Sequence, residues 1–356
     1  MIDIIAGARP NFVKIAPIIQ AIQSSDLLDF RLIHTGQHYD KKMSSDFFDD
    51  LNIPKPNFNL GAGSGSQAEQ TAKIMTGYED VLNEQKPNLC LVVGDVNSTM
   101  ACSITAKKLH VPVAHVEAGI RSGDLRMPEE INRMVTDSIS DIFFTTTGQA
   151  VDNLIKLGHD KNCIHFVGNT MIDTLVSNID RLRKPTVYDS IPLEAKDYLV
   201  ITLHRPSNVN NHEVLVSNLE SINTFLRDKK AIFPCHPRIK STLQDNFNNF
   251  SNLIFCEPMS YLEFNFLVKN SLGIVTDSGG ITEEATFMGI PCMTLRDSTE
   301  RPETVNIGTN ELIGTDIRNL KTPLEKLLGG NWKKGAVPKK WDGKTSERIV
   351  RILERL

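Results

Sequence analysis

Short apolar runs alternate with longer amphipathic segments along most of the chain. Ile2–Ala6, Leu89–Val93 and Ile142–Thr145 are apolar at nearly every position, as strands buried on both faces of a sheet should be. Gln67–Asn83 and Thr99–Leu109 instead carry apolar residues at helical spacing. The repeated alternation predicts an α/β fold in which parallel sheets are covered by helices on both faces.

The alternation stops near residue 170 and then begins again. Val167–Thr170 ends the first series, Lys184–Lys196 is rich in proline and charge, and Tyr198–Leu203 begins a second series of strands. We therefore expect two doubly wound, Rossmann-like domains that face each other across a cleft, formed by residues 1–169 and 170–345. A final amphipathic helix is expected at residues 346–356, where it can pack on either domain.

The composition narrows the class of protein. The 356 residues are 40% hydrophobic and 23% charged, with a net charge of −4, which suits a globular protein and gives no support to a nucleic-acid or anionic-membrane partner. No apolar run approaches the length of a membrane span, and the first residues lack the basic region of a signal peptide. Six cysteines without a C-x-x-C spacing indicate neither a zinc site nor a redox pair. A reducing cytoplasm is the expected compartment.

The stretch Thr276–Glu303 carries the densest set of candidate binding residues. A turn at Ser278–Gly280 joins an apolar strand to a helix that carries Glu283–Glu284, and Arg296 and Arg301 follow. Glycines let backbone N–H groups approach an anion, and a helix start adds a positive dipole end. A tight turn with solvated glutamates is the simpler alternative. Turn, acids and arginines together predict a site for a nucleoside diphosphate.

Charged residues in the first half of the chain also follow strand ends. Arg9 and Lys14 come after the first strand, Asp95 after Leu89–Val93, and Glu117 after the strand that ends at Val116. Glu129 begins the next helix, and Ser98 is a candidate helix N-cap. Each acid alone could be a turn residue or a helix-dipole partner. Because ligands bind at the carboxyl ends of parallel strands, their convergence predicts an acid–base site.

The second half repeats this arrangement with histidines. His204 and Arg205 follow the strand Tyr198–Leu203, and His236 and Arg238 follow the next strand. Each histidine alone is more often structural than catalytic. The chain has no G-x-S-x-G, P-loop or G-x-G-x-x-G motif, so covalent serine chemistry, P-loop hydrolysis of nucleotides and NAD binding are unsupported.

Several strings together resemble one enzyme family. They are GARPNFVKIAPII, TGQHYD, GDVNSTMA, HVEAGIRSGDLRMPEEINR, VGNTMIDTL, TLHRPSNV, TDSGGITEEA and RDSTERPE, and they are spread from end to end of the chain. On these motifs the chain is similar to the non-hydrolysing UDP-N-acetylglucosamine 2-epimerases, which have the GT-B fold. The resemblance implies a reversible interconversion of UDP-GlcNAc and UDP-ManNAc without an added cofactor. It implies elimination of UDP to 2-acetamidoglucal followed by re-addition, a homodimer, and a final helix that crosses back onto the first domain.

The resemblance also assigns roles by motif. Asp95, Glu117 and Glu129 match the catalytic carboxylates, with Lys14 and His204 beside them. Glu284 is expected to hold the ribose hydroxyls. The remaining residues expected to bind the substrate, most of them through its diphosphate or sugar, are Arg9, Arg121, Arg133, Asn169, Arg205, His236, Ser278, Gly279, Gly280 and Arg301.

Other functions stay open on the sequence. Relatives with the same spellings act on modified UDP-sugars such as diacetamido glucuronic acid derivatives, and hydrolysing relatives release ManNAc and UDP. A glycosyltransferase and a nucleotide-sugar sensor are more distant alternatives. The string Gln37-His38-Tyr39-Asp40-Lys41 lacks the second glutamine with which some bacterial members bind an activating molecule of UDP-GlcNAc.

Overall fold

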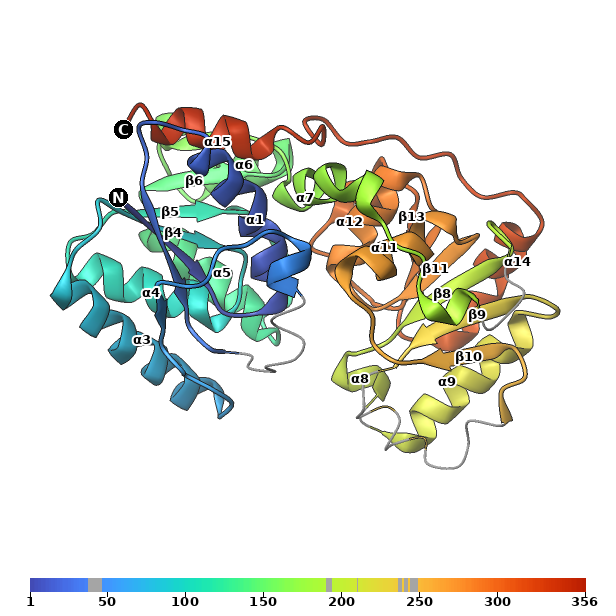
Figure 1. Cartoon of the computed structure of the whole chain (residues 1–356). Helices are drawn as coiled ribbons and strands as arrows, with labels where there is room; N and C mark the ends of the chain where they lie inside the picture. The colour runs from blue at the N-terminus through green and yellow to red at the C-terminus, as the bar shows by residue number, and fades with distance from the viewer. Residues whose placement is uncertain (38–46, 190–193, 210, 236–238, 240–242, 244–248) are drawn as a thin grey trace. The chain divides into compact units, whose positions relative to one another are not determined.

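The computed structural model describes the chain except for residues 38–46, 190–193, 210, 236–238, 240–242 and 244–248. It divides the chain into two compact units (Figure 1). The first unit contains Met1–Ser177 together with Lys339–Leu356, and the second contains Asn178–Pro338. Each unit is built around one parallel sheet.

The sheet of the first unit has the strand order β3-β2-β1-β4-β5-β6-β7. All of its neighbouring strands pair in parallel. The strands are β1 (Ile2–Ala6), β2 (Phe30–His34), β3 (Phe58–Asn59), β4 (Leu89–Val93), β5 (Val113–Val116), β6 (Ile142–Thr145) and β7 (Ile164–Phe166). The chain passes first to one side of β1 and then, from β4 onward, to the other, so the switch point lies between β1 and β4.

Helices flank this sheet, with α3 and α4 on one side and α1 and α15 on the other (Figure 1). The apolar residues that α3 and α4 turn toward the sheet, among them Ile74, Tyr78 and Ala101, are fully buried. The helices of this unit are α1 (Arg9–Gln23), α3 (Gln67–Glu84), α4 (Asn97–Lys108), α5 (Pro128–Ile139), α6 (Gly148–Lys156), α7 (Thr170–Asn178) and α15 (Thr345–Leu353).

The second unit repeats the same topology with the order β10-β9-β8-β11-β12-β13, again in parallel. Its strands are β8 (Tyr198–Thr202), β9 (Lys230–Pro234), β10 (Leu253–Cys256), β11 (Gly273–Thr276), β12 (Cys292–Thr294) and β13 (Asn310–Leu312). Its helices are α8 (Pro206–Val209), α9 (His212–Phe225), α11 (Tyr261–Asn270), α12 (Gly279–Met288), α13 (Pro302–Asn306) and α14 (Lys321–Leu328). The predicted fold class, with two doubly wound parallel sheets, is confirmed.

Two helix starts differ from the sequence-based expectation. Helix α1 begins at Arg9, earlier than the predicted Phe12, because Pro10 suits the first turn and the Asn11 side chain accepts the Gly7 and Ala8 N–H groups. Helix α4 begins at Asn97, so Ser98 is inside the helix and is not its N-cap. Its hydroxyl instead lies 2.7 Å from the hydroxyl of Thr35.

Helix α7 and the end of the chain are fixed to the first unit. The hydroxyl of Thr174 donates to the Val13 carbonyl, and Asp173 accepts the N–H groups of Thr345 and Ser346 at the start of α15. Helix α15 in turn packs against α1. The division at Ser177 therefore leaves α7 in the first unit, whereas the predicted boundary places it after residue 169 in the second domain.

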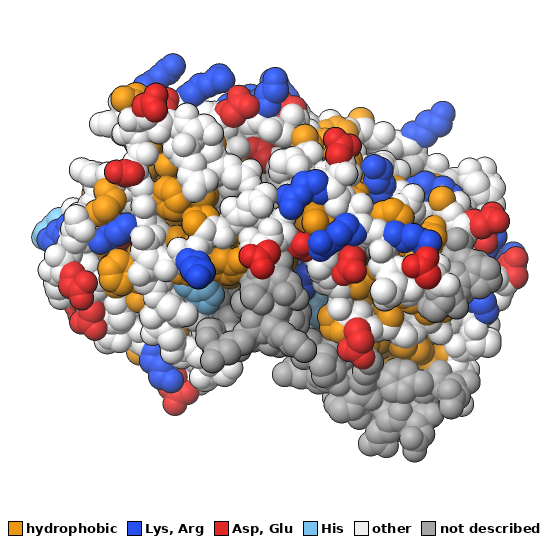
Figure 2. Space-filling view, viewed as in Figure 1, with side chains coloured by type: hydrophobic (Ala, Val, Ile, Leu, Met, Phe, Trp, Pro, Cys, Tyr) orange, Lys and Arg blue, Asp and Glu red, His pale blue; other side chains and the backbone are white. Residues whose placement is uncertain are grey.

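Charged side chains of both signs are interspersed over the face seen in Figure 2. No large area of a single charge dominates that face.

Gly168 gives a direct test of how the last segment is held. Its φ is +109°, and a Cβ atom there would overlap the Lys340 carbonyl oxygen, whereas Gly158 has φ +91° with open space around it. We expect Gly168→Ala to lower the free energy of unfolding of the first unit by about 3 kcal/mol, and Gly158→Ala by about 1 kcal/mol. Urea unfolding followed by Trp341 fluorescence in a Trp332→Phe background measures both. Equal losses would contradict the contact between Gly168 and Lys340.

Candidate functional site at the two sheet switch points

Most of the predicted site residues lie near the switch point of each sheet. In the first unit they lie in the loops after β1, β4 and β5 and on α1 and α5. In the second unit they lie in the loops after β8 and β11 and on α12. This is the edge at which open parallel sheets bind ligands.

A buried ion pair joins two of these segments in the first unit. The Lys14 ammonium on α1 donates to Glu117 Oε2 at 2.6 Å, and both side chains are almost fully buried. Glu117 follows β5 with φ +71°, a left-handed conformation that turns its side chain toward α1. Gly94 lies beneath the pair, where a Cβ atom would be 3.0 Å from Lys14 Nζ. Glycine at position 94 leaves room for the lysine ammonium and suits the backbone φ of +68°.

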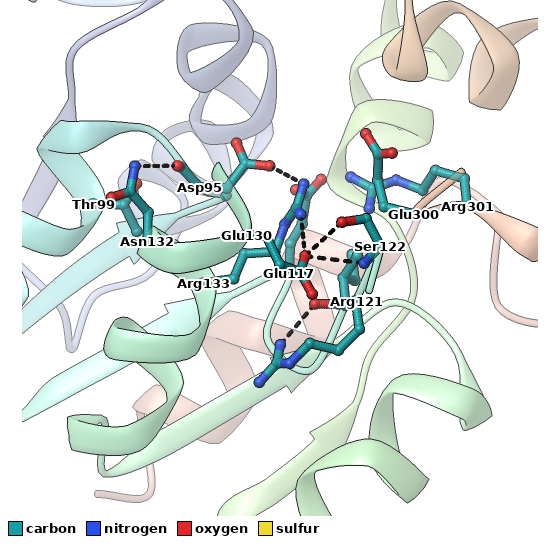
Figure 3. A network of polar contacts seen from close by, with 12 residues as sticks. Asp95, Thr99, Glu117, Arg121, Ser122, Glu130, Asn132, Arg133, Glu300 and Arg301 are labelled. Atoms are coloured by element: carbon teal, nitrogen blue, oxygen red, sulfur yellow. Dashed lines mark hydrogen bonds and ion pairs between the residues drawn. The ribbon is translucent and has the colours of Figure 1, made fainter. Parts of the chain in front are cut away.

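Arg133 connects the loop after β4 with the start of α5. Its guanidinium bonds the Asp95 carboxylate with one nitrogen and Glu130 Oε2, at 2.8 Å, with the other (Figure 3). Asp95 keeps 20% of its side chain exposed, whereas Arg133 keeps 4%. The arginine thus fixes the direction of a carboxylate that stays accessible.

Glu130 is a structural partner of this network. It accepts the backbone N–H groups of Ser122 and Gly123 and the hydroxyl of Ser122 (Figure 3). Burial acts to raise the pKa of the Glu130 carboxyl, but these donors and Arg133 outweigh it and hold the pKa below its ordinary value. Glu130 therefore stays ionised and holds the 120–123 loop against α5.

The neighbouring Glu129 has a different environment. Because successive residues of a helix point about 100° apart, the side chain of Glu129 lies on a different face of α5 from that of Glu130. It borders a cavity of about 330 Å³ whose other walls are mostly amide and small polar side chains. They are Gln37, Ser64, Gly65, Gln67, Gln70, Val96, Asn97, Pro128 and Asn132.

In the second unit, Asp277 organises the loop after β8. Its buried carboxylate accepts the N–H groups of His204 and Arg205, the side-chain amide of Asn208 and, at 2.7 Å, His204 Nδ1. The His204 side chain is 60% exposed, so the contact at Nδ1 leaves the rest of the ring accessible. Burial acts to raise the pKa of Asp277, but hydrogen bonds and charge from His204, with Asn208 and Arg205, hold it below the ordinary value.

The glycine turn and the start of α12 form the second part of this site. Ser278 is the N-cap of α12, and Gly279 and Gly280 form its first turn. The Ser278 N–H donates to the hydroxyl of Thr276. A Cβ atom at Gly279 would lie 2.9 Å from Glu300 Oε1, so a larger residue would require that side chain to move. The N–H groups of Gly279 and Gly280 at the helix start remain the predicted donors to an anion.

The two glutamates of α12 have separate partners. Glu284 accepts the Tyr261 hydroxyl at 2.8 Å and is buried, and burial together with the Glu284 charge raises the pKa of Tyr261 well above its ordinary value. Glu283 accepts Arg301 Nε at 2.6 Å in a buried contact. Arg296 pairs with Glu300 at 2.7 Å. Each charge that the sequence singled out here has a partner within the same unit.

The other predicted residues are more dispersed. Arg9 is exposed, with its guanidinium carbon 4.9 Å from the centre of the Phe47 ring. Arg121 pairs with Asp137 at 2.6 Å, and the Asn169 side chain accepts the Met171 N–H at the start of α7. Arg205 donates from Nε to the Asp277 carbonyl. His236 lies outside the described residues.

Sequence reasoning missed the carboxylates that hold the loops. Asp137 and Asp277 accept backbone N–H groups 18 and 72 residues away, and Glu130 accepts one from a loop eight residues before it. None of the three was predicted as a site residue. Asp277 had a detectable signal, because it lies between a strand end and the glycine turn. Asp137 had none, since it looks like any polar residue on an amphipathic helix.

Two further findings concern the described residues alone. They contain no group of three or more His, Cys, Asp or Glu side chains placed to hold a metal ion. None of their helices has the length and apolar character needed to cross a membrane.

Known sequences resemble the chain along its whole length. A family model described as UDP-N-acetylglucosamine 2-epimerase matches residues 20–354. A UDP-N-acetylglucosamine 2-epimerase from Methanocaldococcus jannaschii is 43% identical, over 99% of this chain and 98% of that protein. A UDP-2,3-diacetamido-2,3-dideoxy-D-glucuronate 2-epimerase from Pseudomonas aeruginosa is 37% identical, over 99% of both chains.

Solved structures of similar proteins point to the same family. The crystal structure of the Methanocaldococcus jannaschii enzyme in complex with UDP-GlcNAc and UDP has a TM-score of 0.90 at 42% identity, with 100% of this chain and 99% of that chain covered. The enzyme from Neisseria meningitidis bound to UDP-GlcNAc has a TM-score of 0.90 at 29% identity, with both chains fully covered.

The lowered pKa of Asp277 predicts how the second unit responds to acid. A carboxyl whose pKa is depressed by folding stabilises the fold above its unfolded value, near 3.8, and loses that contribution as the pH falls through the folded value. We expect Asp277→Asn to cost about 2 kcal/mol at pH 7 and progressively less from about pH 5 to about pH 3. Urea unfolding followed by Trp332 fluorescence in a Trp341→Phe background measures the difference. The exposed Asp228→Asn is the control, and a cost that grows toward low pH would contradict this account.

Proposed function

The chain belongs to the UDP-N-acetylglucosamine 2-epimerase family, and on that premise we propose that it interconverts UDP-GlcNAc and UDP-ManNAc. The proposed route is elimination of UDP across C1–C2 to give 2-acetamidoglucal, followed by re-addition of UDP. The observation that carries the proposal is the set of ion-paired carboxylates, Glu117 with Lys14 and Asp95 with Arg133, at the switch point of the first sheet. We also propose that the chain acts as a cytoplasmic homodimer, as the family resemblance implies.

The chemistry at C2 requires groups that move protons on both faces of the sugar. In the forward direction a base takes the C2 proton while the C1–O bond to UDP breaks, which leaves a C1–C2 double bond and free UDP. In the return step a β-phosphate oxygen of UDP attacks C1 and an acid protonates C2 on the opposite face. We assign these transfers to Asp95, Glu117 and Glu129, which lie on three adjoining segments of the first unit.

The cations of the first unit suit this chemistry. Lys14 and Arg133 contact Glu117 and Asp95 directly and fix the directions of these two carboxyl groups. Their positions are fixed before the substrate binds, which lowers the cost of reorganisation in the transition state.

The second unit is proposed to bind UDP, the leaving group. Ser278 and the N–H groups of Gly279 and Gly280 at the start of α12, together with His204 and Arg205, would hold the diphosphate. Glu284 would accept the ribose hydroxyls beside Tyr261. Arg9, Arg121, Asn169, His236 and Arg301 are proposed to complete the contacts with the sugar and diphosphate. Stabilising UDP as it departs promotes loss of the C2 proton, because positive charge builds at C1.

A second candidate substrate has its own support. The 37% identity with the UDP-2,3-diacetamido-2,3-dideoxy-D-glucuronate 2-epimerase spans the full chain. Both substrates undergo the same change at C2, so the carboxylates of the first unit serve either one. The two substrates differ in the groups attached to C3 and C6 of the sugar.

Deuterium incorporation tests the reaction class. With UDP-GlcNAc in deuterated water, we expect UDP-ManNAc and recovered UDP-GlcNAc to carry deuterium at C2, as seen by NMR and mass spectrometry. A parallel incubation with UDP-2,3-diacetamido-2,3-dideoxyglucuronate identifies the preferred sugar. Free ManNAc with accumulating UDP would identify a hydrolase, and UDP-GlcNAc binding without exchange would identify a sensor.

Replacing a carboxylate by its amide separates the effect on proton transfer at C2 from the effect on UDP binding. Asp95→Asn and Glu117→Gln should each lower the rate of C2 exchange by at least about 100-fold, because each removes a proton-transfer group. UDP affinity measured by calorimetry should change less than about threefold, because neither carboxylate is among the proposed contacts with the diphosphate. Glu79→Gln, on the exposed side of α3, is the matched control. Exchange at the normal rate in both variants would remove the carboxylates from the mechanism.

A further inference from the structure

His115 is a fully buried histidine with two acceptors facing its ring. It lies on β5, two residues before Glu117. Its Nε2 is 2.8 Å from the Gly94 carbonyl oxygen, and its Nδ1 is 2.7 Å from Asp137 Oδ1. The proposed mechanism does not use this side chain.

The partners determine where the protons of the ring lie. A backbone carbonyl can only accept, so Nε2 must carry a proton. Asp137 also faces the Gly119 N–H at 3.1 Å and the Arg121 guanidinium at 2.6 Å, both of which favour a carboxylate. A carboxylate accepts as well, so Nδ1 must carry a second proton. The hydrogen bonds are thus satisfied by an imidazolium.

The charge of Asp137 fits this arrangement. Burial acts to raise the pKa of its carboxyl, but His115 and Arg121 outweigh burial and hold the pKa below the ordinary value. The ionised aspartate and the protonated histidine compensate each other in a region from which water is excluded.

The same pair joins three segments of the candidate site. The Gly94 carbonyl belongs to the peptide bond that precedes Asp95, and Gly94 has φ +68°. Gly119 follows Glu117 by two residues, has φ +78°, and would overlap the Ala150 carbonyl oxygen if it carried a Cβ atom. Asp137 itself is on α5, the helix that also carries Glu129. These contacts therefore tie the backbone beside Asp95 and Glu117 to α5, the helix that carries Glu129.

We propose that His115 is a positioning residue, present as a buried imidazolium, that fixes the Gly94–Asp95 peptide and with it the Asp95 carboxylate. The inference rests on the proposed function, because Asp95 matters only if it acts at C2. His115 touches neither Asp95 nor the substrate side of the loop through its ring, so its effect passes through the backbone. A displacement of about 1 Å in a reacting group can cost about 100-fold in rate.

Kinetics of His115→Gln test the positioning role. We expect kcat for C2 exchange to fall about 10- to 100-fold, while KM for UDP-GlcNAc and UDP affinity change less than about threefold. His159→Gln is the matched control, because His159 packs on Phe143, the β6 partner of His115, without facing Gly94. Unchanged kcat in folded His115→Gln enzyme, even with lowered thermal stability, would overturn the positioning role.

Nitrogen-15 NMR of histidine-labelled protein tests the imidazolium without using activity. Of the nine histidines, one should show both ring nitrogens protonated at pH 7.5 with slowly exchanging protons, and its signals should disappear in His115→Gln. In Asp137→Asn the same ring should become neutral with its proton on Nε2, because the new amide can donate to Nδ1. A neutral His115 ring in the unsubstituted protein would overturn the inference.

Failure of the His115 inference can be told apart from failure of the proposed function. If the unsubstituted protein shows no C2 exchange with either UDP-sugar, the proposed function fails, while the nitrogen-15 measurement still reports the charge of His115. If Asp95→Asn retains exchange, Asp95 has no role at C2 and the positioning role fails with it. If Asp95→Asn abolishes exchange while His115→Gln keeps the normal kcat, only the inference fails.

Discussion

The buried contact between the Lys14 ammonium and the Glu117 carboxylate is the interaction on which the first site depends. Two charges removed from water cost several kcal/mol each to desolvate, and their attraction offsets this only in close, well-aligned geometry. The contact is 2.6 Å, and the two residues are 103 apart in the sequence. The ion pair is therefore weak evidence for a gain in folding stability, but it shows that the fold brings α1 and the loop after β5 together. The contact forms beside Gly94, whose φ of +68° favours glycine, and Glu117 has a left-handed backbone with φ +71°.

Each unit organises its switch point around a buried aspartate. Asp137 accepts the Gly119 N–H and contacts His115 and Arg121, and Asp277 accepts the N–H groups of His204 and Arg205. In both places charge-assisted hydrogen bonds from a buried carboxylate fix a loop at a strand end. The loops can then present carboxylates in one unit and N–H donors in the other without large apolar contacts of their own.

The sequence was sufficient for the fold class because fully apolar runs such as Leu89–Val93 fit only strands buried on both faces. Strand ends were also predictable, and with them the places of Asp95, Glu117 and the Ser278–Gly280 turn. The hydrogen-bond and ion-pair partners of these residues were not predictable, because they depend on tertiary contacts. Ser98 looked like an N-cap but bonds Thr35, and Asp277 reaches a loop 73 residues away.

The central claim is that the C1–O bond to UDP breaks and re-forms during each C2 exchange. The direct measurement uses UDP-GlcNAc labelled with oxygen-18 in the bridge between C1 and the β-phosphorus. Because the released β-phosphate can rotate before re-addition, the account predicts that the label moves into non-bridging positions as deuterium enters C2. Deuterium at C2 with the label still wholly in the bridge would contradict elimination of UDP.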